Sequence, residues 1–375
     1  MIWQRFFRPS LPTTLASLRS PKKGHWLLGL ACATVFLLLT SALLVRNQMV
    51  KTITPKKVEK PKVVHEPVLR PEYLPAPAVP TNSTGNRYAF ATWLSSTEGA
   101  NSDSLDDDIY FVATRLLVWQ VLHDPLTKSS GIDMVVMVGP DVSETHRERL
   151  RKDGAIVRPM ELVHGLDDAW IVPKFSRWST VMGKLRAWEM EEYSRVVLLD
   201  GDMILQSPLD DIFDDPGVQL MRTKPDVGRL PDEPELPDEY VLGTYMEIGG
   251  VRHSWPPKEW EHNPRYFNAG FFVLKPDRKM FEYFLGLLDL NSRFDPTYPE
   301  QNLLNYAFRW DGAMPWKEID DVWNIRFATE KDLDGGVVSI HGKWWHPRSG
   351  GNQLRDLMLS KRWQMHGYYM GREGL

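Results

Sequence analysis

The chain has 375 residues, of which 42% are hydrophobic and 25% carry a charge, and its formal net charge at pH 7 is −4. This composition is typical of a globular protein with one large domain or two small ones, and it gives no reason to expect nucleic acid binding. The single cysteine, Cys32, excludes an intrachain disulfide. The 15 tryptophans suit either a bulky core or stacking against sugars.

The N-terminal part of the chain is predicted to anchor it in a membrane. Residues 26–45 hold no charge, and a helix of this length, at about 1.5 Å per residue, spans the ~30 Å core of a bilayer. Residues 1–25 are basic and contain no acid. A short basic tail, one apolar segment and a long downstream domain together predict a cytosolic tail, a signal anchor and a single-pass type II protein.

Residues 46–86 are predicted to form a stem between the anchor and the folded domain. They are rich in proline and lysine, a composition that favours an extended, solvated spacer. Asn82 begins the sequence "NST", which is an N-glycosylation acceptor and fits a lumenal location. We therefore expect the catalytic domain to occupy residues 87–375 on the lumenal side.

Predicted strands and helices alternate at the start of this domain. The strands are mainly continuous apolar runs, as expected for strands that are buried on both faces. We expect strands at 87–94, 132–139, 155–160 and 195–200, and helices at 108–125, 143–154 and 178–193. This order predicts an α/β fold, with a mostly parallel central sheet and helices on both faces. Ligands of such sheets bind beyond the carboxyl ends of the strands.

The stretch "RVVLLDGD" ends one of these strands with Asp200, Gly201 and Asp202. Asp and Gly also form plain turns, so the triplet alone does not define a site. Two carboxylates at a strand end can hold Mn²⁺ or Mg²⁺ together with phosphate oxygens. They would serve either a phosphatase of the haloacid-dehalogenase type or a nucleotide-sugar transferase. The phosphatase motif belongs on the first strand, whereas three strand–helix units precede this triplet.

Four further stretches place the triplet in a larger pattern. Residues 182–216, 265–276 ("RYFNAGFFVLKP"), 298–308 ("YPEQNLLNYAF") and 337–347 ("VVSIHGKWWHP") follow one another in the order found in glycosyltransferase family 8. Together with residues 87–120, they resemble these glycogenin-like retaining enzymes, which have the GT-A fold. Within the family the chain looks most like fungal members related to Golgi N-acetylglucosaminyltransferases, with glucosyl- and galactosyltransferases close by.

The resemblance implies a reaction and a location. It implies transfer of a hexose or N-acetylhexosamine from a UDP-sugar, UDP-GlcNAc or UDP-glucose, to a glycan or glycoprotein, with Mn²⁺ as cofactor and Mg²⁺ as the alternative. The anomeric configuration would be retained, and the protein would reside in the Golgi membrane. A non-catalytic family member that holds a glycan is the remaining alternative. The oligomeric state does not follow from the sequence.

The metal and diphosphate ligands follow from the same resemblance. Asp200 and Asp202 match the D-x-D motif of the family, and His341 matches its third metal ligand. Lys343, after Gly342, matches a contact to the diphosphate. Without the family pattern, a lone histidine is more often a core residue, and a lone lysine is more often solvated.

The resemblance also assigns the rest of the donor site. Gly201, which has no side chain, would let the ribose and the metal approach the backbone. Lys184 would lie near the donor sugar or diphosphate, although a lysine on a helix is more often exposed. Ala91, Thr92 and Tyr110 match the uridine end, and Tyr110 would otherwise be half-buried core.

The catalytic assignments are implied for two other motifs. Asn268 and Gly270 match the loop that contacts donor and acceptor sugars, although "NAG" also fits a plain turn. Gln301 matches a residue on the β-face of the donor sugar. Glu300 stands where the family usually has Asp and is one methylene longer, so it would orient sugar hydroxyls instead of acting as a nucleophile, and Lys184 joins these residues as a catalytic candidate. No suitably spaced pair of carboxylates is identified, which favours an ion-pair route over a covalent one.

The acidic, proline-rich stretch 222–262 separates the D-x-D strand from "NAG". It is predicted to be either a solvated loop or a lid over the acceptor site, and Trp255 and Trp260 could stack on a sugar there.

Overall fold

The computed structural model describes residues 87–375, apart from 102–103, 225, 347–350 and 375. The predicted tail 1–25, anchor 26–45 and stem 46–86 with its sequon at Asn82 lie outside the described residues, so they stay predictions. Within the described ranges, every helix is too short or too polar to cross a membrane.

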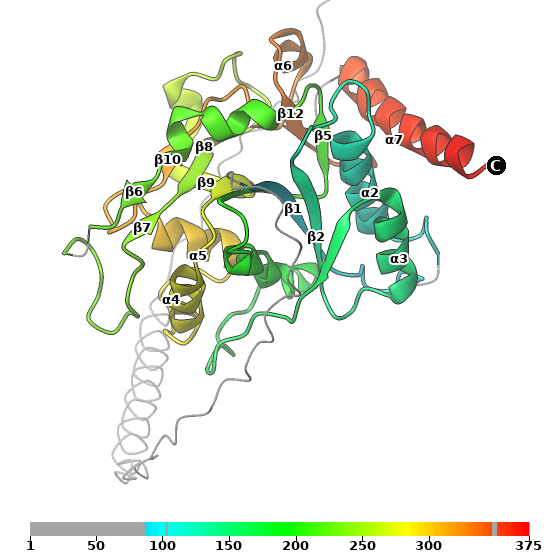
Figure 1. Cartoon of the computed structure of the whole chain (residues 1–375). Coiled ribbons are helices and arrows are strands. Elements are labelled where there is room, and N and C mark those ends of the chain that lie inside the picture. Colours follow the sequence, from blue (N-terminus) through cyan, green and yellow to red (C-terminus); the bar gives the residue numbers. More distant parts are fainter. Residues whose placement is uncertain (1–86, 102–103, 225, 347–350, 375) are drawn as a thin grey trace, which may run out of the picture. The chain divides into compact units, whose positions relative to one another are not determined.

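The centre of the domain is a seven-stranded sheet with the strand order β10-β8-β9-β4-β1-β2-β3 (Figure 1). Strand β9 runs antiparallel to both of its neighbours, β4 and β8, and the other neighbouring pairs are parallel. The predicted mostly parallel sheet is therefore confirmed. The strands are β1 (Tyr88–Leu94), β2 (Asp133–Val138), β3 (Ile156–Pro159), β4 (Arg195–Leu199), β8 (Leu242–Ile248), β9 (His262–Leu274) and β10 (Lys317–Glu318).

Two smaller sheets flank the main one. The first has the order β11-β12-β5, from Ile325–Arg326, Ser339–His341 and Met203–Leu205. Because β12 pairs antiparallel with β5, His341 lies opposite Met203, directly after the D-x-D motif. The second pairs β6 (Met221–Arg222) with β7 (Glu239–Tyr240).

Local capping residues set the start of α2 and both ends of α3. Asp108 accepts hydrogen bonds from the backbone N–H groups of Tyr110 and Phe111, at 3.0 and 3.1 Å, and so begins helix α2 (Ile109–Leu122). Ser143 begins α3 (Glu144–Asp153), and Gly154 ends it with a left-handed φ of 106°. These two helices confirm the predictions for 108–125 and 143–154.

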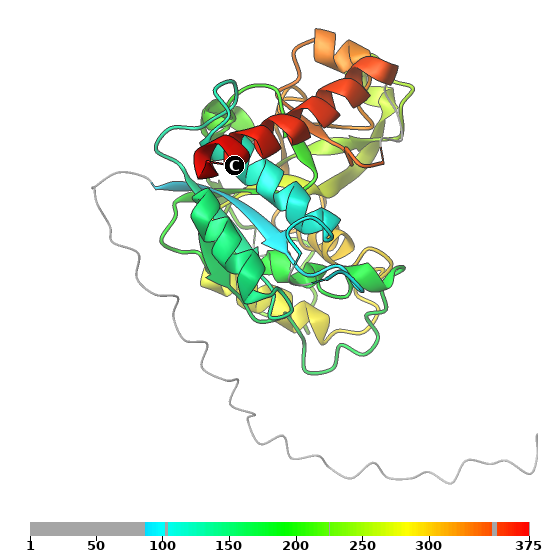
Figure 2. The same cartoon turned by 90° about the vertical axis from the view of Figure 1, so that its right-hand side faces the viewer.

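Alternate side chains of β1 enter the two cores of the domain. Ala89, Ala91 and Trp93 join the core under helices α4 (Arg278–Leu288) and α5 (Pro299–Ala307), whereas Phe90 and Leu94 join the core under α2 and α3. Helices thus cover both faces of the sheet, as predicted, and Figure 2 shows α2 and α3 on one of them. The remaining α-helices are α6 (Glu330–Asp334) and α7 (Gly351–Glu373).

Short 3₁₀ helices complete the described elements. They are η1 (Ser176–Trp178), η2 (Val181–Glu189), η3 (Asp210–Asp214), η4 (Pro216–Val218) and η5 (Glu259–Glu261). The prediction of one regular helix over 178–193 is therefore wrong. Gly183 explains why the segment packs so closely, because a Cβ there would lie 2.2 Å from the ring of Trp93.

Two further alternatives are corrected. Asn268 and Gly270 lie inside strand β9, so "NAG" is not a turn before a strand. Stretch 222–262 is not simply a solvated loop, because it contains β8, whose Leu242 is fully buried. In the same stretch Trp255 donates a hydrogen bond to the carbonyl of Gly335, at 2.9 Å, and Trp260 is 76% exposed.

Candidate active site

The D-x-D motif directly follows β4, at the carboxyl end of the sheet. The backbone N–H of Asp200 donates to the carbonyl of Gly270 on β9, at 2.8 Å, and the N–H of Gly342 donates to the carbonyl of Asp202, at 3.0 Å. These two bonds fix the motif between β9 and the residues after β12. As a result, ligand atoms of Asp200, Asp202 and His341 all lie within 4.8 Å of one another.

The three side chains face each other with particular atoms. His341 Nε2 lies 3.2 Å from Asp202 Oδ1 and 3.6 Å from Asp200 Oδ2. The remaining ring nitrogen, His341 Nδ1, is buried and has no hydrogen-bond partner among the described residues. The inward-facing atoms are thus one oxygen from each carboxylate and one imidazole nitrogen.

Two lysines hold the outer oxygens of the same carboxylates. Lys184 Nζ lies 2.7 Å from Asp200 Oδ1, and Lys343 Nζ lies 2.9 Å from Asp202 Oδ2. Burial would raise the pKa of Asp202, but His341 and Lys343 outweigh it and hold that pKa well below its ordinary value. Burial would likewise lower the pKa of Lys343, but Asp202 raises it above the usual range. Both groups are therefore charged at neutral pH.

This donor set fits a divalent cation. Two carboxylate oxygens and one imidazole nitrogen converge, and the far oxygen of each carboxylate contacts a lysine. The absence of a side chain at Gly270 lets the ligands pack directly against the backbone of β9, because a Cβ there would lie 2.4 Å from His341 Cε1 and 2.7 Å from Asp200 Oδ2. Sequence reasoning assigned Gly270 to the donor sugar, whereas the structure places it directly against the candidate metal ligands.

Lys184 also joins the D-x-D motif to helix α5. Its Nζ lies 3.0 Å from Glu300 Oε1, in addition to its contact with Asp200. Burial would lower the pKa of Lys184, but the charges of Asp200 and Glu300 outweigh it and raise that pKa above the ordinary value. Glu300 is therefore the partner of a buried cation, which reduces its strength as a nucleophile.

Gln301, the next residue on α5, is held by three hydrogen bonds. Its Oε1 accepts from Asn268 Nδ2 at 3.0 Å and from the N–H of Ala269 at 3.2 Å. Its Nε2 donates to the hydroxyl of Tyr266 at 2.6 Å, and that hydroxyl donates to Asn302 at 2.7 Å. Tyr266 therefore fixes which side of the Gln301 amide faces Asn268.

Tyr110 and Gly201 lie on the opposite side of the motif, toward helix α2. The hydroxyl of Tyr110 accepts a hydrogen bond from Lys343 Nζ at 3.2 Å, and its ring packs edge-on against Trp345 with centroids 5.4 Å apart. Gly201 lies against α2, where a Cβ would come within 2.9 Å of Thr114 Oγ1. The structure thus brings Tyr110 and Lys343 together with the D-x-D motif.

Ala91 and Thr92 are not brought into this group. Both lie within β1 and are fully buried, with Ala91 in the core under α4 and α5. Thr92 Oγ1 has no hydrogen-bond partner among the described residues. Since β1 ends at Leu94, the residues that follow it are better placed for a ligand than Ala91 or Thr92.

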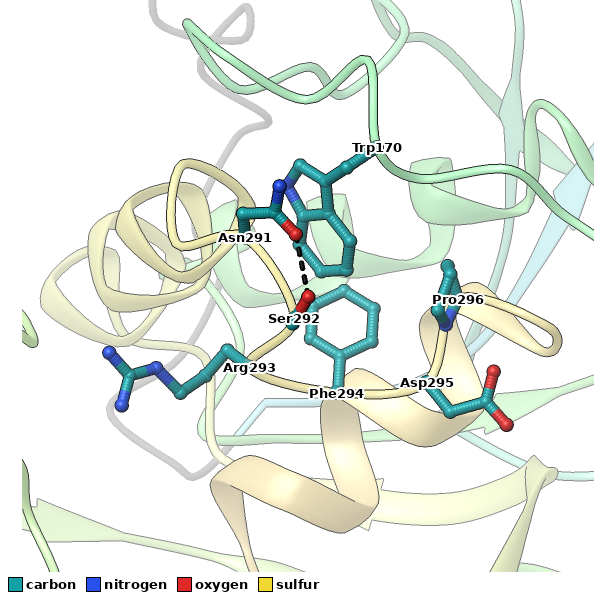
Figure 3. Close-up of a pocket in the computed structure, with 7 residues that line it drawn as sticks. All are labelled: Trp170, Asn291, Ser292, Arg293, Phe294, Asp295 and Pro296. Atoms are coloured by element: carbon teal, nitrogen blue, oxygen red, sulfur yellow. Dashed lines mark hydrogen bonds between the residues drawn. The ribbon is translucent and has the colours of Figure 1, made fainter. Parts of the chain in front are cut away.

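A pocket of about 520 Å³ lies elsewhere on the domain. It is lined by Trp170, Asn291, Ser292, Arg293, Phe294, Asp295 and Pro296, and none of these residues belongs to the charged group (Figure 3). The ring of Trp170 packs edge-on against Phe294, with centroids 4.9 Å apart. The candidate active site is therefore defined by its side-chain chemistry, and this pocket is a separate feature.

Sequence reasoning missed Tyr266, Thr114 and Trp345. In the sequence, only the position of Tyr266 two residues before Asn268, in "RYFNAG", indicates that it could belong to the site. Thr114 and Trp345 lie one helical turn from Tyr110 and two residues after Lys343, respectively, but spacing alone does not show which way their side chains point.

Comparison with known proteins gives consistent matches. Residues 107–338 match the sequence model described as glycosyl transferase family 8. An uncharacterized protein of Schizosaccharomyces pombe is 29% identical over 297 residues, which cover 70% of this chain and 76% of that protein. Galactinol synthase 7 of Arabidopsis thaliana is 32% identical over 261 residues, which cover 62% of this chain and 72% of the synthase. The solved structure of an active-site mutant of LgtC aligns with 73% of this chain and 94% of its own, at 15% identity and a TM-score of 0.44.

Proposed function

The chain belongs to glycosyl transferase family 8, and we propose on that premise that it transfers a hexose or N-acetylhexosamine from a UDP-sugar to a glycan or glycoprotein. Family membership makes it a retaining glycosyltransferase, and we propose the GT-A fold for its sheet. UDP-GlcNAc and UDP-glucose are the proposed donors.

One observation carries the proposal. The inner atoms of Asp200, Asp202 and His341 converge, while Lys184 and Lys343 hold the outer oxygens. We propose that the inner atoms hold Mn²⁺, since an imidazole among the ligands favours it over Mg²⁺. Such a cation supplies a Lewis acid that neutralises the diphosphate of the leaving group.

The residues of this chain would then divide the remaining work. Lys343 lies next to Asp202 and would turn its ammonium group toward the diphosphate as a second positive charge. Tyr110, bonded to Lys343, would contact the uridine end. Asn268 and Gln301, bonded to each other, would face the donor sugar. Gly201 and Gly342 keep the backbone close to the nucleotide.

The retained configuration is best explained without a covalent intermediate. A covalent route needs a free carboxylate on the β-face of the sugar, and Glu300 is instead paired with Lys184 at 3.0 Å. We infer that Glu300 and Lys184 act as a positioning pair, and that the acceptor hydroxyl attacks from the face that UDP leaves.

The location is proposed from residues 1–86. The uncharged stretch 26–45, the basic tail before it and the stem after it support a single-pass type II protein of the Golgi membrane, with the catalytic domain in the lumen.

The phosphatase alternative is not favoured. Its nucleophile would be Asp200, but that residue follows β4, the fourth strand along the chain, and its Oδ1 is ion-paired with Lys184. The non-catalytic alternative predicts a degraded site, whereas Asp200, Asp202, His341 and Lys343 are present and lie together.

A UDP-release assay tests the proposal. The full chain is incubated with a panel of UDP-sugars and Mn²⁺, with and without EDTA, because many transferases slowly hydrolyse their donor without an acceptor. We expect release from one UDP-sugar that EDTA and Asp202→Asn abolish and that Asp211→Asn, an exposed acid on η3, leaves unchanged. Release that is equal in Asp202→Asn and wild type would contradict the proposal.

A further inference from the structure

The segments that lead into Lys184 and Glu300 carry a surface cluster made of Lys174, Phe175, Arg177, Trp178 and Tyr298, which we call the aromatic–cation cluster. The ring centroids of Trp178 lie 4.8 Å from Phe175 and 5.1 Å from Tyr298. Phe175 is 41% exposed and Tyr298 38%. Two of the three neighbouring rings are thus exposed, and Trp178 between them is half-buried.

The two cations of the cluster lie over these rings. The Arg177 guanidinium is 4.4 Å from the centroid of Phe175 and 5.1 Å from that of Trp178. Lys174 Nζ is 5.7 Å from the centroid of Phe175 and 5.9 Å from that of Tyr298. The rings therefore hold both cations in place by cation–π attraction.

Both cations keep their hydrogen-bond donors free. In the part of the chain that the structure describes, no carboxylate lies within ion-pair distance of Lys174 or Arg177, and both are exposed. The nearby acid Glu98 contacts Ser176 Oγ, at 3.4 Å, instead of either cation. A guanidinium carries five N–H donors and an ammonium three, so the cluster can bind an anion without first breaking an ion pair.

The position of the cluster links it to sugar transfer. Its two segments lead directly into site residues, because Tyr298 precedes Glu300 by two positions and Trp178 precedes Lys184 by six. The segments are joined by the N–H of Lys174, which donates to the carbonyl of Thr297 at 3.1 Å. Thr180 Oγ1 in turn donates to Ser95 Oγ, at 2.8 Å, directly after β1. The cluster thus lies between the end of β1 and the start of α5.

The pocket of Figure 3 is lined by residues that precede the two segments of the cluster along the chain. Trp170 lies four positions before Lys174, and Pro296, the last of the lining residues, lies two positions before Tyr298. Arg293 in this pocket is already paired with Asp232, so the pocket itself offers no free cation. It offers an aromatic surface and space beside the cluster for the uncharged part of a longer saccharide.

We propose that the aromatic–cation cluster binds the acceptor, and that it selects a saccharide carrying a negative charge, either a carboxylate or a phosphate. The inference rests on the proposed function. The exposed rings of Phe175 and Tyr298, with the half-buried Trp178 between them, contact the apolar face of a sugar, and Arg177 and Lys174 bind its acidic group.

The test compares charged and neutral saccharides on the full chain, with UDP and Mn²⁺ present. The probes are methyl β-glucuronide and glucose 6-phosphate, against methyl β-glucoside, and dissociation constants are read from saturation-transfer NMR. We expect each anionic probe, or one of the two, to bind about tenfold more tightly than the neutral one. A preference for only one of them identifies the acidic group.

Three variants locate the effect. Lys174→Gln with Arg177→Gln should remove the preference for anions, and Lys128→Gln with Arg372→Gln, the same charge loss at exposed positions elsewhere, should keep it. Tyr298→Leu removes a ring but no charge, so it should weaken all three probes equally. Equal binding of charged and neutral probes by the wild type, or a preference that survives in Lys174→Gln with Arg177→Gln, would overturn the proposal.

UDP release in the same samples separates this proposal from the proposed function. Donor hydrolysis should be unchanged in Lys174→Gln with Arg177→Gln, since neither side chain contacts the D-x-D motif. If UDP is released but anionic and neutral saccharides bind equally, the acceptor proposal is wrong and the proposed function still stands. Failure to release UDP from every donor defeats the proposed function, while the preference for anions is still decided by the binding data.

Discussion

Two groups of buried charged residues in this domain differ in which groups contact their carboxylate oxygens. In the first, Asp153 on α3 is fully buried, and each of its oxygens lies 2.7 Å from an arginine, Arg115 on α2 or Arg149. Arg149 continues to Glu373 at the end of α7, at 2.6 Å. In the second, the candidate active site, Asp200 and Asp202 each have one oxygen on a lysine and the other turned toward His341.

The difference separates a structural ion cluster from a binding one. The cluster around Asp153 is closed, because arginines occupy both carboxylate oxygens, and it ties α2, α3 and α7 together. In the site around Asp202, no lysine or arginine lies on the inner oxygens, which face His341 instead, and a cation would complete the group there. Burial and charge alone do not distinguish the two groups, whereas the partners of each oxygen atom do.

The largest expected effect comes from removing a charged ligand from the candidate metal site. Asp202→Asn removes one inner oxygen charge, and we expect UDP release to fall about a thousandfold, because bound metal supplies several kcal/mol of transition-state stabilisation. Rates at saturating Mn²⁺ and UDP-sugar measure this loss, with circular dichroism to confirm folding. A variant that keeps wild-type rates would remove Asp202 from the metal site.

The closed cluster should respond in stability instead. Asp153→Asn leaves Arg115 and Arg149 facing an uncharged amide, and we expect the free energy of unfolding to drop by about 3 kcal/mol. Urea denaturation measures the drop, while UDP release per folded molecule should stay at the wild-type level. Glu144→Gln, which breaks the exposed pair with Arg151, is the matched control and should leave the urea midpoint unchanged. Lost activity in folded Asp153→Asn would mean that the two groups are coupled.

The next largest effect is expected from adding a side chain beside the candidate metal ligands. Gly270→Ala places a methyl group 2.4 Å from His341 Cε1, so we expect UDP release to fall about tenfold to a hundredfold, with weaker Mn²⁺ dependence. Gly367→Ala on α7 has no atom within 4 Å of the added carbon and serves as the control. Equal activity of the two variants would show that the site tolerates displacement of His341.

The smallest expected effect concerns the support of Gln301. Tyr266→Phe removes the hydroxyl that accepts from Gln301 Nε2, and we expect kcat to fall about tenfold while the KM for the UDP-sugar stays constant. Steady-state kinetics separate the two parameters. An increase in KM with unchanged kcat would assign Tyr266 to donor binding instead of positioning.

Much of the fold follows from local signals. The acidic cap at Asp108 and the Ser143–Gly154 pair define helices α2 and α3, and the apolar runs define β1, β2 and β4. The 3₁₀ form of η2 does not, because over nine residues a period of 3.0 is hard to tell from 3.6, and the contact of Gly183 with Trp93 is tertiary.

The candidate site could be predicted only in part for a similar reason. Asp200, Asp202 and His341 converge as the family pattern implies, although 139 positions separate the last two (341 − 202). The contacts of Lys184 with Glu300 and of Tyr266 with Gln301 depend on how β9, η2 and α5 pack, which no local pattern encodes. Ala91 and Thr92 match the family pattern by their position in the sequence, but they lie within a buried strand.

The most direct test of the central claim is a Mn²⁺ titration of the full chain in the presence of UDP, followed by electron paramagnetic resonance of the free ion. The inner oxygens of Asp200 and Asp202, which face His341, predict one bound Mn²⁺ per chain in the wild type and in Asp153→Asn, and loss of that site in Asp202→Asn. A wild-type chain that binds no Mn²⁺, or an Asp202→Asn chain that binds it as tightly as the wild type, would contradict the account.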